Sequence, residues 1–350
     1  MICGVFCTSY HMEQEATGDR EQDGRSKDDH NIRKKMKTKV FIDGSEGTTG
    51  LRIYERFAGR DDIELMKIDP ALRKEPVERA KMINASDITF LCLPDAASRE
   101  SVSLVENDHV RIIDTSTAHR VDDAWVYGFP ELNATQRDKI RNSKRIAVPG
   151  CYATGFISIA APMIASKLMN PDYPVSAFAV SGYSGAGKKA IAVYEGDEKP
   201  ADFNAPREYA LTQQHKHIPE MQKMSGLTRT PLFSPIVDDY YAGMFVSLPF
   251  YTDLLNHVTG PEQVQEMFAS YYEGERFIRV MPPEAEDASN GFISANVYAG
   301  NDALQIFVTG NAERIVVTAR FDNLGKGASG AAIQCMNIVL GCEEDRGLQI

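Results

Sequence analysis

The sequence predicts an α/β protein with a doubly wound parallel sheet in its first half and an α+β domain with a largely antiparallel sheet in its second half. A glycine-rich turn directly follows the first apolar run. Short apolar runs then alternate with amphipathic segments up to about residue 149, which is typical of a parallel sheet covered on both faces. Beyond it, longer and often alternating apolar runs are separated by few helices, as in antiparallel sheets.

The composition is that of a soluble globular protein, since 43% of the 350 residues are hydrophobic and 25% are charged. The net charge of −11 repels nucleic acid and anionic lipid. No run approaches the roughly 18 apolar residues of a membrane-spanning helix. The six cysteines show no zinc or disulfide spacing. We therefore expect a cytoplasmic protein with reduced thiols, no metal, and neither nucleic acid nor membrane as partner.

Residues 1–35 are predicted to form a disordered N-terminal extension. From His11 to Lys37 the sequence holds seven acidic and seven basic residues and almost no large apolar side chains. Such a stretch buries too little surface to offset its ordering entropy. A disordered tail and a start codon placed too far upstream both fit this composition.

The elements of the first half follow from helical spacing and from short apolar runs. Leu51, Tyr54 and Phe57 have the spacing of a helix that begins after the glycine-rich turn, and a second helix is predicted at residues 76–85. Buried strands are predicted at residues 39–43, 63–69, 88–93, 110–114 and 145–148.

The second half is predicted to contain two main helices, at residues 261–272 and 328–340. Small residues open the last helix, so it could pack closely back against the first part of the chain. Strands are predicted at residues 175–182, 244–251, 292–299, 304–309 and 314–321.

The glycine-rich turn is the first chemical signal. Gly44, Gly47 and Gly50 lie between the first strand and the first helix. Glycine lets the backbone turn tightly and approach a pyrophosphate, whose charge is met by amides at a helix N-terminus. Thr48 and Thr49 can donate further hydrogen bonds to the same anion. The position after the opening strand favours a Rossmann-like dinucleotide site over a tight turn alone.

Residues near the second strand leave the cofactor open between NAD and NADP. Asp69 lies about 20 residues after the turn, where a carboxylate holds the adenosine ribose of NAD. Arg73 and Lys74 follow closely and could instead hold the 2′-phosphate of NADP.

Cys151 lies in a Pro-Gly turn between a strand and an apolar helix. At a helix N-terminus the dipole lowers the pKa of a thiol, and the resulting thiolate can attack an acyl carbon. Backbone amides of the same turn can stabilise the oxyanion that forms. The alternative is a small buried thiol, the role we assign to Cys92 and Cys335. Both interpretations fit the surroundings of Cys151.

His215 and His217 lie just ahead of a helix whose first turn accommodates Pro219. A positive imidazolium is disfavoured there, and a neutral imidazole suits acid–base catalysis near neutral pH. The pair could also have a structural role or begin a metal site, although no further ligand cluster accompanies it. Beside a candidate nucleophile, catalysis is the favoured role.

Residues 38–342 resemble the N-acetyl-γ-glutamyl-phosphate reductases, specifically their shorter type (type 2), within the aspartate-semialdehyde dehydrogenase-like superfamily. Eight blocks in the right order carry this resemblance, which makes it far more specific than any single block. The blocks are the turn at 44–50, LCLPD at 91–95, DTS at 114–116 with Arg120, YGFPE at 127–131, PGCYATG at 149–155, SGYSGAGK at 181–188, HKHIPE at 215–220 and NLGKG at 323–327.

The resemblance implies an enzyme of arginine biosynthesis that uses NADPH to reduce an acyl phosphate to N-acetylglutamate 5-semialdehyde, with release of phosphate. Cys151 would attack the acyl phosphate and form a thioester, which hydride from NADPH would reduce. His215 or His217 would protonate the oxygen and help to keep Cys151 ionised.

The resemblance also implies the remaining site residues and the domains. Residues 36–149 plus 325–350 would form the NADP-binding domain and residues 150–324 the catalytic and dimerisation domain of a homo-oligomer, suggested to be a tetramer. The loop at 181–188 could cradle phosphate or be an ordinary connection. Further cofactor contacts are assigned to Leu93, Pro94, Ser116, Gly185, Asn323 and Lys326, and substrate contacts to Arg120, Ser184, Lys188 and Glu220.

Two other functions remain open. An aspartate-semialdehyde dehydrogenase shares the thioester chemistry, but its substrate carries a free amino group that needs a nearby acid. A non-catalytic dinucleotide sensor would keep the fold and lose the chemistry, whereas every catalytic position named above is still occupied.

Overall fold

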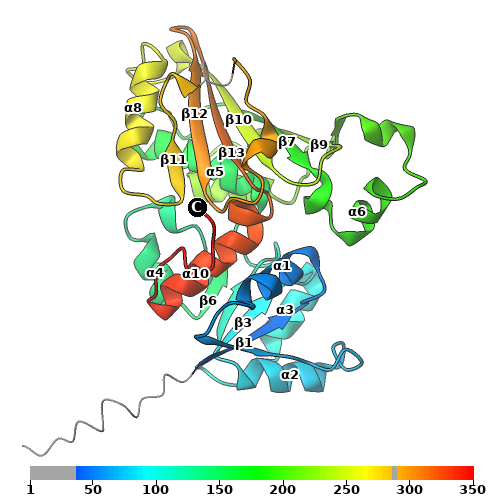
Figure 1. The fold of residues 1–350 in the computed structure, drawn as a ribbon. Helices are drawn as coiled ribbons and strands as arrows, with labels where there is room; N and C mark the ends of the chain where they lie inside the picture. The colour runs from blue at the N-terminus through cyan, green and yellow to red at the C-terminus, as the bar shows by residue number, and fades with distance from the viewer. Residues whose placement is uncertain (1–36, 286–289) are drawn as a thin grey trace, which may run out of the picture. The chain divides into compact units, whose positions relative to one another are not determined.

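The computed structural model describes residues 37–285 and 290–350, and the extension predicted over residues 1–35 lies outside them. Within the described residues, six parallel strands form the first sheet in the order β2-β1-β3-β4-β6-β5 (Figure 1). The strands are β1 (Thr38–Asp43), β2 (Ile63–Met66), β3 (Ile88–Leu91), β4 (Arg111–Asp114), β5 (Val126–Tyr127) and β6 (Arg145–Ala147).

Helices cover both faces of this sheet because its strands carry apolar side chains on each side. Val40 and Ile42 belong to one apolar cluster and Phe41 to another, as the alternation along a strand requires. The cluster around Val40 also contains residues of the last helix, including Ile333. The helices are α1 (Thr48–Phe57), α2 (Pro76–Ala85), α3 (Asp95–Ser103), α4 (Gln136–Asn142) and α10 (Gly330–Leu340).

The second sheet is mixed and largely antiparallel, with the order β11-β12-β13-β10-β7-β9-β8 among the described residues. Only the pairs β11–β12 and β7–β9 are parallel in this sheet as described. The predicted fold class is confirmed. The strands are β7 (Ser176–Gly182), β8 (Arg207–Glu208), β9 (Leu232–Asp238), β10 (Met244–Tyr251), β11 (Ile278–Val280), β12 (Leu304–Gly310) and β13 (Arg314–Phe321).

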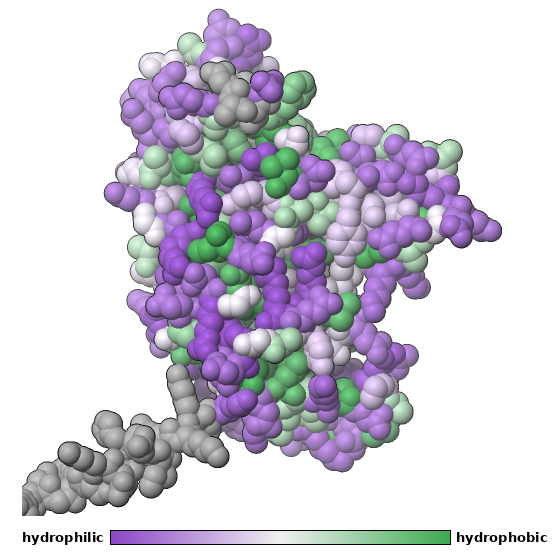
Figure 2. All heavy atoms as spheres, viewed as in Figure 1, coloured by the Kyte–Doolittle hydropathy of each residue, from purple (hydrophilic) through white to green (hydrophobic). Residues whose placement is uncertain are grey.

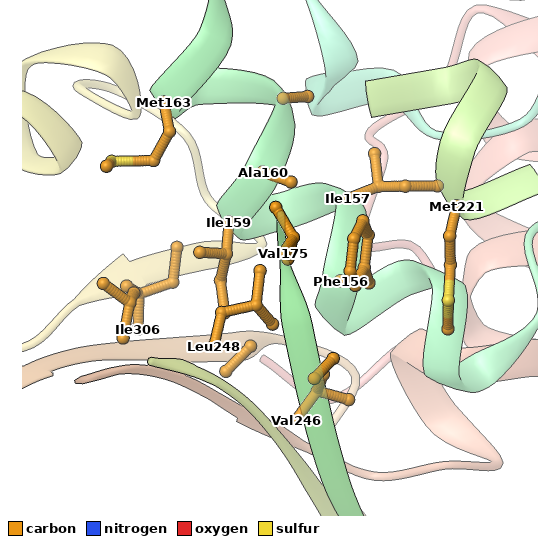
Figure 3. Packing of buried hydrophobic residues seen from close by; sticks show 14 of the residues in the cluster. Phe156, Ile157, Ile159, Ala160, Met163, Val175, Met221, Val246, Leu248 and Ile306 are labelled. Carbon is orange, nitrogen blue, oxygen red and sulfur yellow. The ribbon is translucent and has the colours of Figure 1, made fainter. Parts of the chain in front are cut away.

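The apolar helix α5 (Cys151–Ala165) lies against the second sheet and forms the centre of its core. Ile159 of α5 lies on the side facing Leu248 of β10 and Ile306 of β12 (Figure 3). Gly155 permits the close approach, because a Cβ atom there would lie 2.7 Å from Cγ2 of Val246. The first residue of this tightly held helix is Cys151.

Three smaller helical elements surround the N-terminus of α5. Helix α7 (Ile218–Ser225) packs on α5. Helix α6 (Lys188–Tyr194) belongs to a segment, residues 183–209, that follows β7 and includes β8 (Figure 1). We call this segment the α6 lobe. A π-helical turn, η6 (Gly325–Ser329), leads into α10 and contacts α5.

The strand predicted at residues 292–299 is wrong. Residues Ala295–Tyr298 form a 3-10 turn that contacts β7, β10 and β13. The following strands β12 and β13 are already paired on both sides, so they leave this segment no edge to join. Short elements not predicted include β8, β9, β11 and α6, because they are brief or interrupted by polar residues.

The surface in view is mostly hydrophilic, with hydrophobic residues in small separate groups (Figure 2). In the described ranges, no helix combines the length and apolar character that crossing a membrane requires.

Candidate active site

Two adjoining cavities, of about 520 and 350 Å³, lie beyond the carboxyl ends of β3, β4 and β6. Ligands of open parallel sheets bind at this edge. Thr49, Thr115, Arg120 and Lys216 line both cavities, so a molecule in one can meet a molecule in the other.

The glycine-rich turn has a backbone path that larger residues would obstruct. Gly44 has φ +90°, and a Cβ atom on it would lie 2.4 Å from the carbonyl oxygen of Cys92. A Cβ atom on Gly50 would lie equally close, 2.4 Å, to the carbonyl oxygen of Gly44. The turn ends at Gly47, the N-cap of α1, whose first amides remain available to an anion.

The second cavity brings together most of the residues predicted to contact the cofactor. Its concave wall and the free helix amides fit a dinucleotide pyrophosphate. The predicted residues that line it are Gly47, Thr48, Thr49, Leu93, Pro94, Ser116 and Gly185.

Arg73 lies beside the glycine-rich turn, because its guanidinium forms an exposed ion pair with Glu46 of that turn. Asp69, the alternative ribose ligand, accepts a hydrogen bond from the backbone N–H of Ala71 at 2.9 Å and thereby closes its own turn. Arg73, and not Asp69, is therefore the residue whose side chain contacts the glycine-rich turn.

Cys151 lines the first cavity and is the first residue of α5. Its Cβ packs on Gly327, where an added Cβ atom would lie only 2.8 Å away. Burial raises the pKa of the Cys151 thiol, and the nearby Arg120 guanidinium opposes this rise only in part. This direction is opposite to the lowered pKa that the helix N-terminus predicts, since desolvation outweighs the favourable charges. The thiol needs a base to ionise.

His215 and His217 supply neutral imidazoles in the same cavity. Burial lowers the pKa of His215 to about 4 and that of His217 well below its ordinary value. The rings meet edge to face with centroids 4.6 Å apart, and Nδ1 of His215 accepts a hydrogen bond from the backbone N–H of His217 at 3.1 Å. Buried Nδ1 of His217 has no hydrogen-bond partner within residues 37–285 and 290–350. His217 therefore keeps a ring nitrogen free for proton transfer, whereas Nδ1 of His215 must release its hydrogen bond before it can take a proton.

Gly150, the residue before Cys151, lies in contact with the side chains of His217 and Arg120. A Cβ atom on Gly150 would lie 2.4 Å from Nε2 of His217 and 2.5 Å from Nη1 of Arg120. Both groups thus pack directly on the residue before Cys151, which only glycine permits.

The low pKa of His215 predicts a specific pH dependence of stability. Between about pH 6.5 and 4 the unfolded chain binds a proton at His215 that the folded chain does not, so the free energy of unfolding falls as the pH falls through this range. His215→Asn is expected to make this fall shallower in urea titrations at several pH values. His109→Asn, at an exposed histidine, is the matched control and should leave the slope unchanged. Equal slopes in wild-type and His215→Asn protein would contradict the prediction.

Glu220 was predicted to contact substrate, but it lines neither cavity and is only 1% exposed. It accepts hydrogen bonds from Arg120 Nη1 at 2.8 Å, from the Tyr127 hydroxyl at 2.9 Å and from the Gly150 backbone N–H at 3.2 Å. Its carboxylate therefore positions Arg120 and the turn that carries Cys151. This is a correction of the assigned role.

Arg120 lines both cavities and is held from three sides. Besides Glu220, its Nε donates to the Val148 carbonyl at 2.8 Å and its Nη2 to the Thr115 carbonyl at 2.9 Å. The predicted cation thus lies close to the nucleophile's turn.

The loop at 181–188 contributes to both cavities, but not through its lysine. The Ser184 hydroxyl, at the second cavity, accepts a hydrogen bond from Asn323 Nδ2 at 2.9 Å, and Asn323 lines the first cavity. Lys188 is exposed and lines neither cavity, because it stands at the outward start of α6. Lys216, between the two histidines, is the lysine that lines both.

Lys326 also departs from its predicted role. Its side chain is fully buried, and Nζ donates to both carboxylate oxygens of Glu131 at 2.8 Å and to Gln334 Oε1 at 2.7 Å. The ammonium group is engaged in a buried ion pair, and Lys326 lines neither cavity.

Several residues of the first cavity are not among those predicted. Lys216 could have been found from its place between the histidines, and Arg207 and Tyr209 from their alternation just ahead of that motif. The cavity lining missed by the prediction includes Tyr152, Tyr194, Phe203, Arg207, Tyr209 and Lys216. In the part of the chain that the structure describes, no cluster of side chains suits a metal ion.

Two family models match this chain, one before the turn that carries Cys151 and one from Cys151 onward. Residues 44–142 match the model for the semialdehyde dehydrogenase NAD-binding domain, and residues 151–323 match that for the semialdehyde dehydrogenase dimerisation domain. Among solved structures, an aspartate semialdehyde dehydrogenase II from Vibrio cholerae is similar, with a TM-score of 0.66 at 15% identity, over 87% of this chain and 99% of that one. This likeness concerns the fold.

Curated relatives cover nearly the whole described chain. An N-acetyl-gamma-glutamyl-phosphate reductase 2 from Nostoc is 46% identical over 89% of this chain and 99% of its own length. A reductase of the same name from Sinorhizobium medicae is 46% identical over 87% of this chain and 99% of its own. The resemblance predicted from the eight blocks is thus confirmed, and the chain belongs to the N-acetyl-γ-glutamyl-phosphate reductase family.

Proposed function

We propose that this protein reduces N-acetyl-γ-glutamyl phosphate to N-acetylglutamate 5-semialdehyde with NADPH, releasing phosphate, in cytoplasmic arginine biosynthesis. The observation that carries the proposal is the meeting of Cys151, His215 and His217 in one cavity that adjoins the glycine-rich turn. A nucleophile, a proton acceptor and a dinucleotide site are the three parts that this reaction needs.

Acylation would begin with the Cys151 thiol giving its proton to a neutral imidazole of His215 or His217. The sulfur then attacks the acyl carbon, and the bond from that carbon to the phosphate oxygen breaks. The imidazolium returns its proton to the departing phosphate, which leaves a thioester on Cys151. Arg120 and Lys216 line the same cavity as Cys151, so these two cations would bind the phosphate. They take the role that was predicted for Lys188.

Reduction would take place at the same carbon. When bound, the nicotinamide supplies the hydride that turns the thioester into a hemithioacetal. The histidine stabilises the oxygen while it carries negative charge. Breaking the carbon–sulfur bond then frees the aldehyde, and the Cys151 thiolate takes a proton from solvent through the imidazole.

The lining of the first cavity favours an acetylated substrate over aspartate semialdehyde. No aspartate or glutamate of the described residues lines it. A free ammonium group would be buried there without a partner, whereas an acetamide needs only neutral contacts. This observation weighs against the rival function.

The proposed function is tested by phosphate-dependent oxidation of both semialdehydes with NADP, followed by mass spectrometry of the quenched enzyme. We expect turnover of N-acetylglutamate 5-semialdehyde and an acyl adduct on the peptide that contains Cys151. Preferred turnover of aspartate semialdehyde, or an adduct on another residue, would overturn it.

We propose NADP as the cofactor because Arg73 lies beside the glycine-rich turn. Arg73→Ser is expected to raise the KM for NADPH about 10- to 100-fold, since it removes a charge-assisted contact to the 2′-phosphate, and to leave the KM for NADH within about threefold. Arg141→Ser, at an exposed arginine of α4, serves as the control. Equal effects on NADPH and NADH would contradict the assignment.

We propose a homo-oligomer, with a tetramer as the expected state. Phe178, Leu232 and Tyr251 leave an exposed apolar surface on the second sheet, on the strands that bury their neighbours Ala177, Phe233 and Phe250 in the core. Exposed apolar sheet faces are typical of subunit interfaces. Light scattering of the purified protein measures the state directly.

A further inference from the structure

One cation of the first cavity, Arg207 of β8, takes no part in the proposed chemistry. It reaches the cavity from the α6 lobe, whereas Arg120 is held at the nucleophile's turn. The cavity therefore has a positive group, Arg207, in addition to Arg120 near Cys151. A ligand with two separate anionic ends could bind one end at each guanidinium.

The guanidinium of Arg207 is held in place by aromatic rings. Its central carbon lies 3.3 Å from the centroid of the Phe203 ring and 5.5 Å from that of Tyr194. Nη2 also donates to the Tyr194 hydroxyl at 2.8 Å. Cation–π contacts and this hydrogen bond fix the plane of the fork before any ligand arrives.

One N–H group of the Arg207 guanidinium, at Nε, lacks a hydrogen-bond acceptor among the described residues. Nε of Arg207 is buried, and no group in the described ranges accepts its hydrogen. The nearest acid is Asp202, whose carboxylate lies 3.5 Å from Nη1 and is 69% exposed, so solvent screens much of its charge. A buried N–H without a partner is uncommon, and the residue that carries it lines the first cavity.

Arg207 is connected to the histidines through Tyr209, which follows the end of β8. Tyr209 lies two residues further on, and its ring centroid is 5.7 Å from that of His215 and 6.4 Å from that of Tyr152. Residues two apart on a strand share a face about 7 Å apart. In an extended five-carbon acid, the terminal carboxylate carbon and the carbonyl carbon at the other end are about 5 Å apart.

We propose that Arg207 recognises the α-carboxylate of the substrate and so determines specificity for an acyl phosphate derived from an α-amino acid. This inference rests on the proposed function and deepens it. The carboxylate accepts the free hydrogen of Nε together with one from an Nη atom, a two-point contact that matches the fork. Arg120, predicted to contact the substrate, is left to the phosphate end.

The test compares two aldehydes in phosphate-dependent oxidation, N-acetylglutamate 5-semialdehyde and 4-acetamidobutanal, which lacks only the carboxylate. Wild-type protein should prefer the first by at least about 100-fold in kcat/KM. Arg207→Met should lose about 10- to 100-fold on the first aldehyde and less than about threefold on the second. Arg207→Lys, which keeps the charge and loses the fork, should lie between.

Lys189→Met removes a positive charge from an exposed position of the same lobe and should change neither rate. An equal loss on both aldehydes in Arg207→Met would overturn the inference and leave the proposed function intact, because a structural role impairs both substrates alike. Failure of the wild-type protein to oxidise N-acetylglutamate 5-semialdehyde would instead overturn the proposed function itself.

Discussion

Replacing Cys151 with alanine is expected to lower kcat by at least about 10⁴-fold, since no other group at this position can form the thioester. Dinucleotide affinity should stay within about threefold of wild type, because the glycine-rich turn and the second cavity do not depend on the thiol. Steady-state assays give kcat, and quenching of NADPH fluorescence gives the dissociation constant.

Cys342→Ala is the matched control for this substitution. Cys342 lies after the end of α10 and lines neither cavity, so its loss should leave kcat unchanged. A Cys151→Ala protein that kept more than a tenth of the wild-type rate would remove the nucleophile from the proposed reaction.

Replacing Glu131 with glutamine is expected to lower the free energy of unfolding by about 3–5 kcal/mol, because it leaves the ammonium of Lys326 buried without a counter-charge. Lys326→Met should destabilise less, since Arg137 lies 4.0 Å from Glu131 and Gln334 still donates to its carboxylate. The double variant Glu131→Gln with Lys326→Met should recover part of the loss, because neither charge then remains. Urea denaturation measures all three.

Glu78→Gln provides a surface comparison, since it breaks an exposed ion pair with Lys81. Such pairs contribute about 0–1 kcal/mol, so this variant should unfold close to the wild-type urea concentration. If Glu131→Gln unfolded within that same margin, the buried pair would have no special role in holding η6 and α10 in place.

The fold could be predicted where local pattern and tertiary structure agree. Strand β10 (Met244–Tyr251) and helix α2 (Pro76–Ala85) match their predicted ranges, because an apolar run of strand length and a proline at the helix start are local signals. The segment at 292–299 misled the prediction, since whether an apolar stretch pairs as a strand depends on a free neighbouring edge.

In the candidate site, too, sequence patterns predict local features but not features that depend on tertiary contacts. The glycine-rich turn, Cys151 and the histidines carry short motifs, so sequence alone could propose them as candidates. The role of Lys326 depends on Glu131, which lies 195 residues away in the chain, and the pKa of Cys151 depends on burial by distant segments. Long-range contacts of this kind leave no local pattern, so neither the motifs nor the family resemblance predicted them.

The position of the last helix has a consequence for synthesis on the ribosome. Helix α10 supplies Ala331, Ile333 and Met336 to the same apolar cluster as Val40 and Ile42 of β1. The strands emerge early together with α1, which covers part of this side of the sheet with Ile53 and Phe57. The rest of this side stays uncovered until α10 has left the exit tunnel. The nascent protein must therefore carry exposed apolar surface on its first-made sheet until α10 has been synthesised.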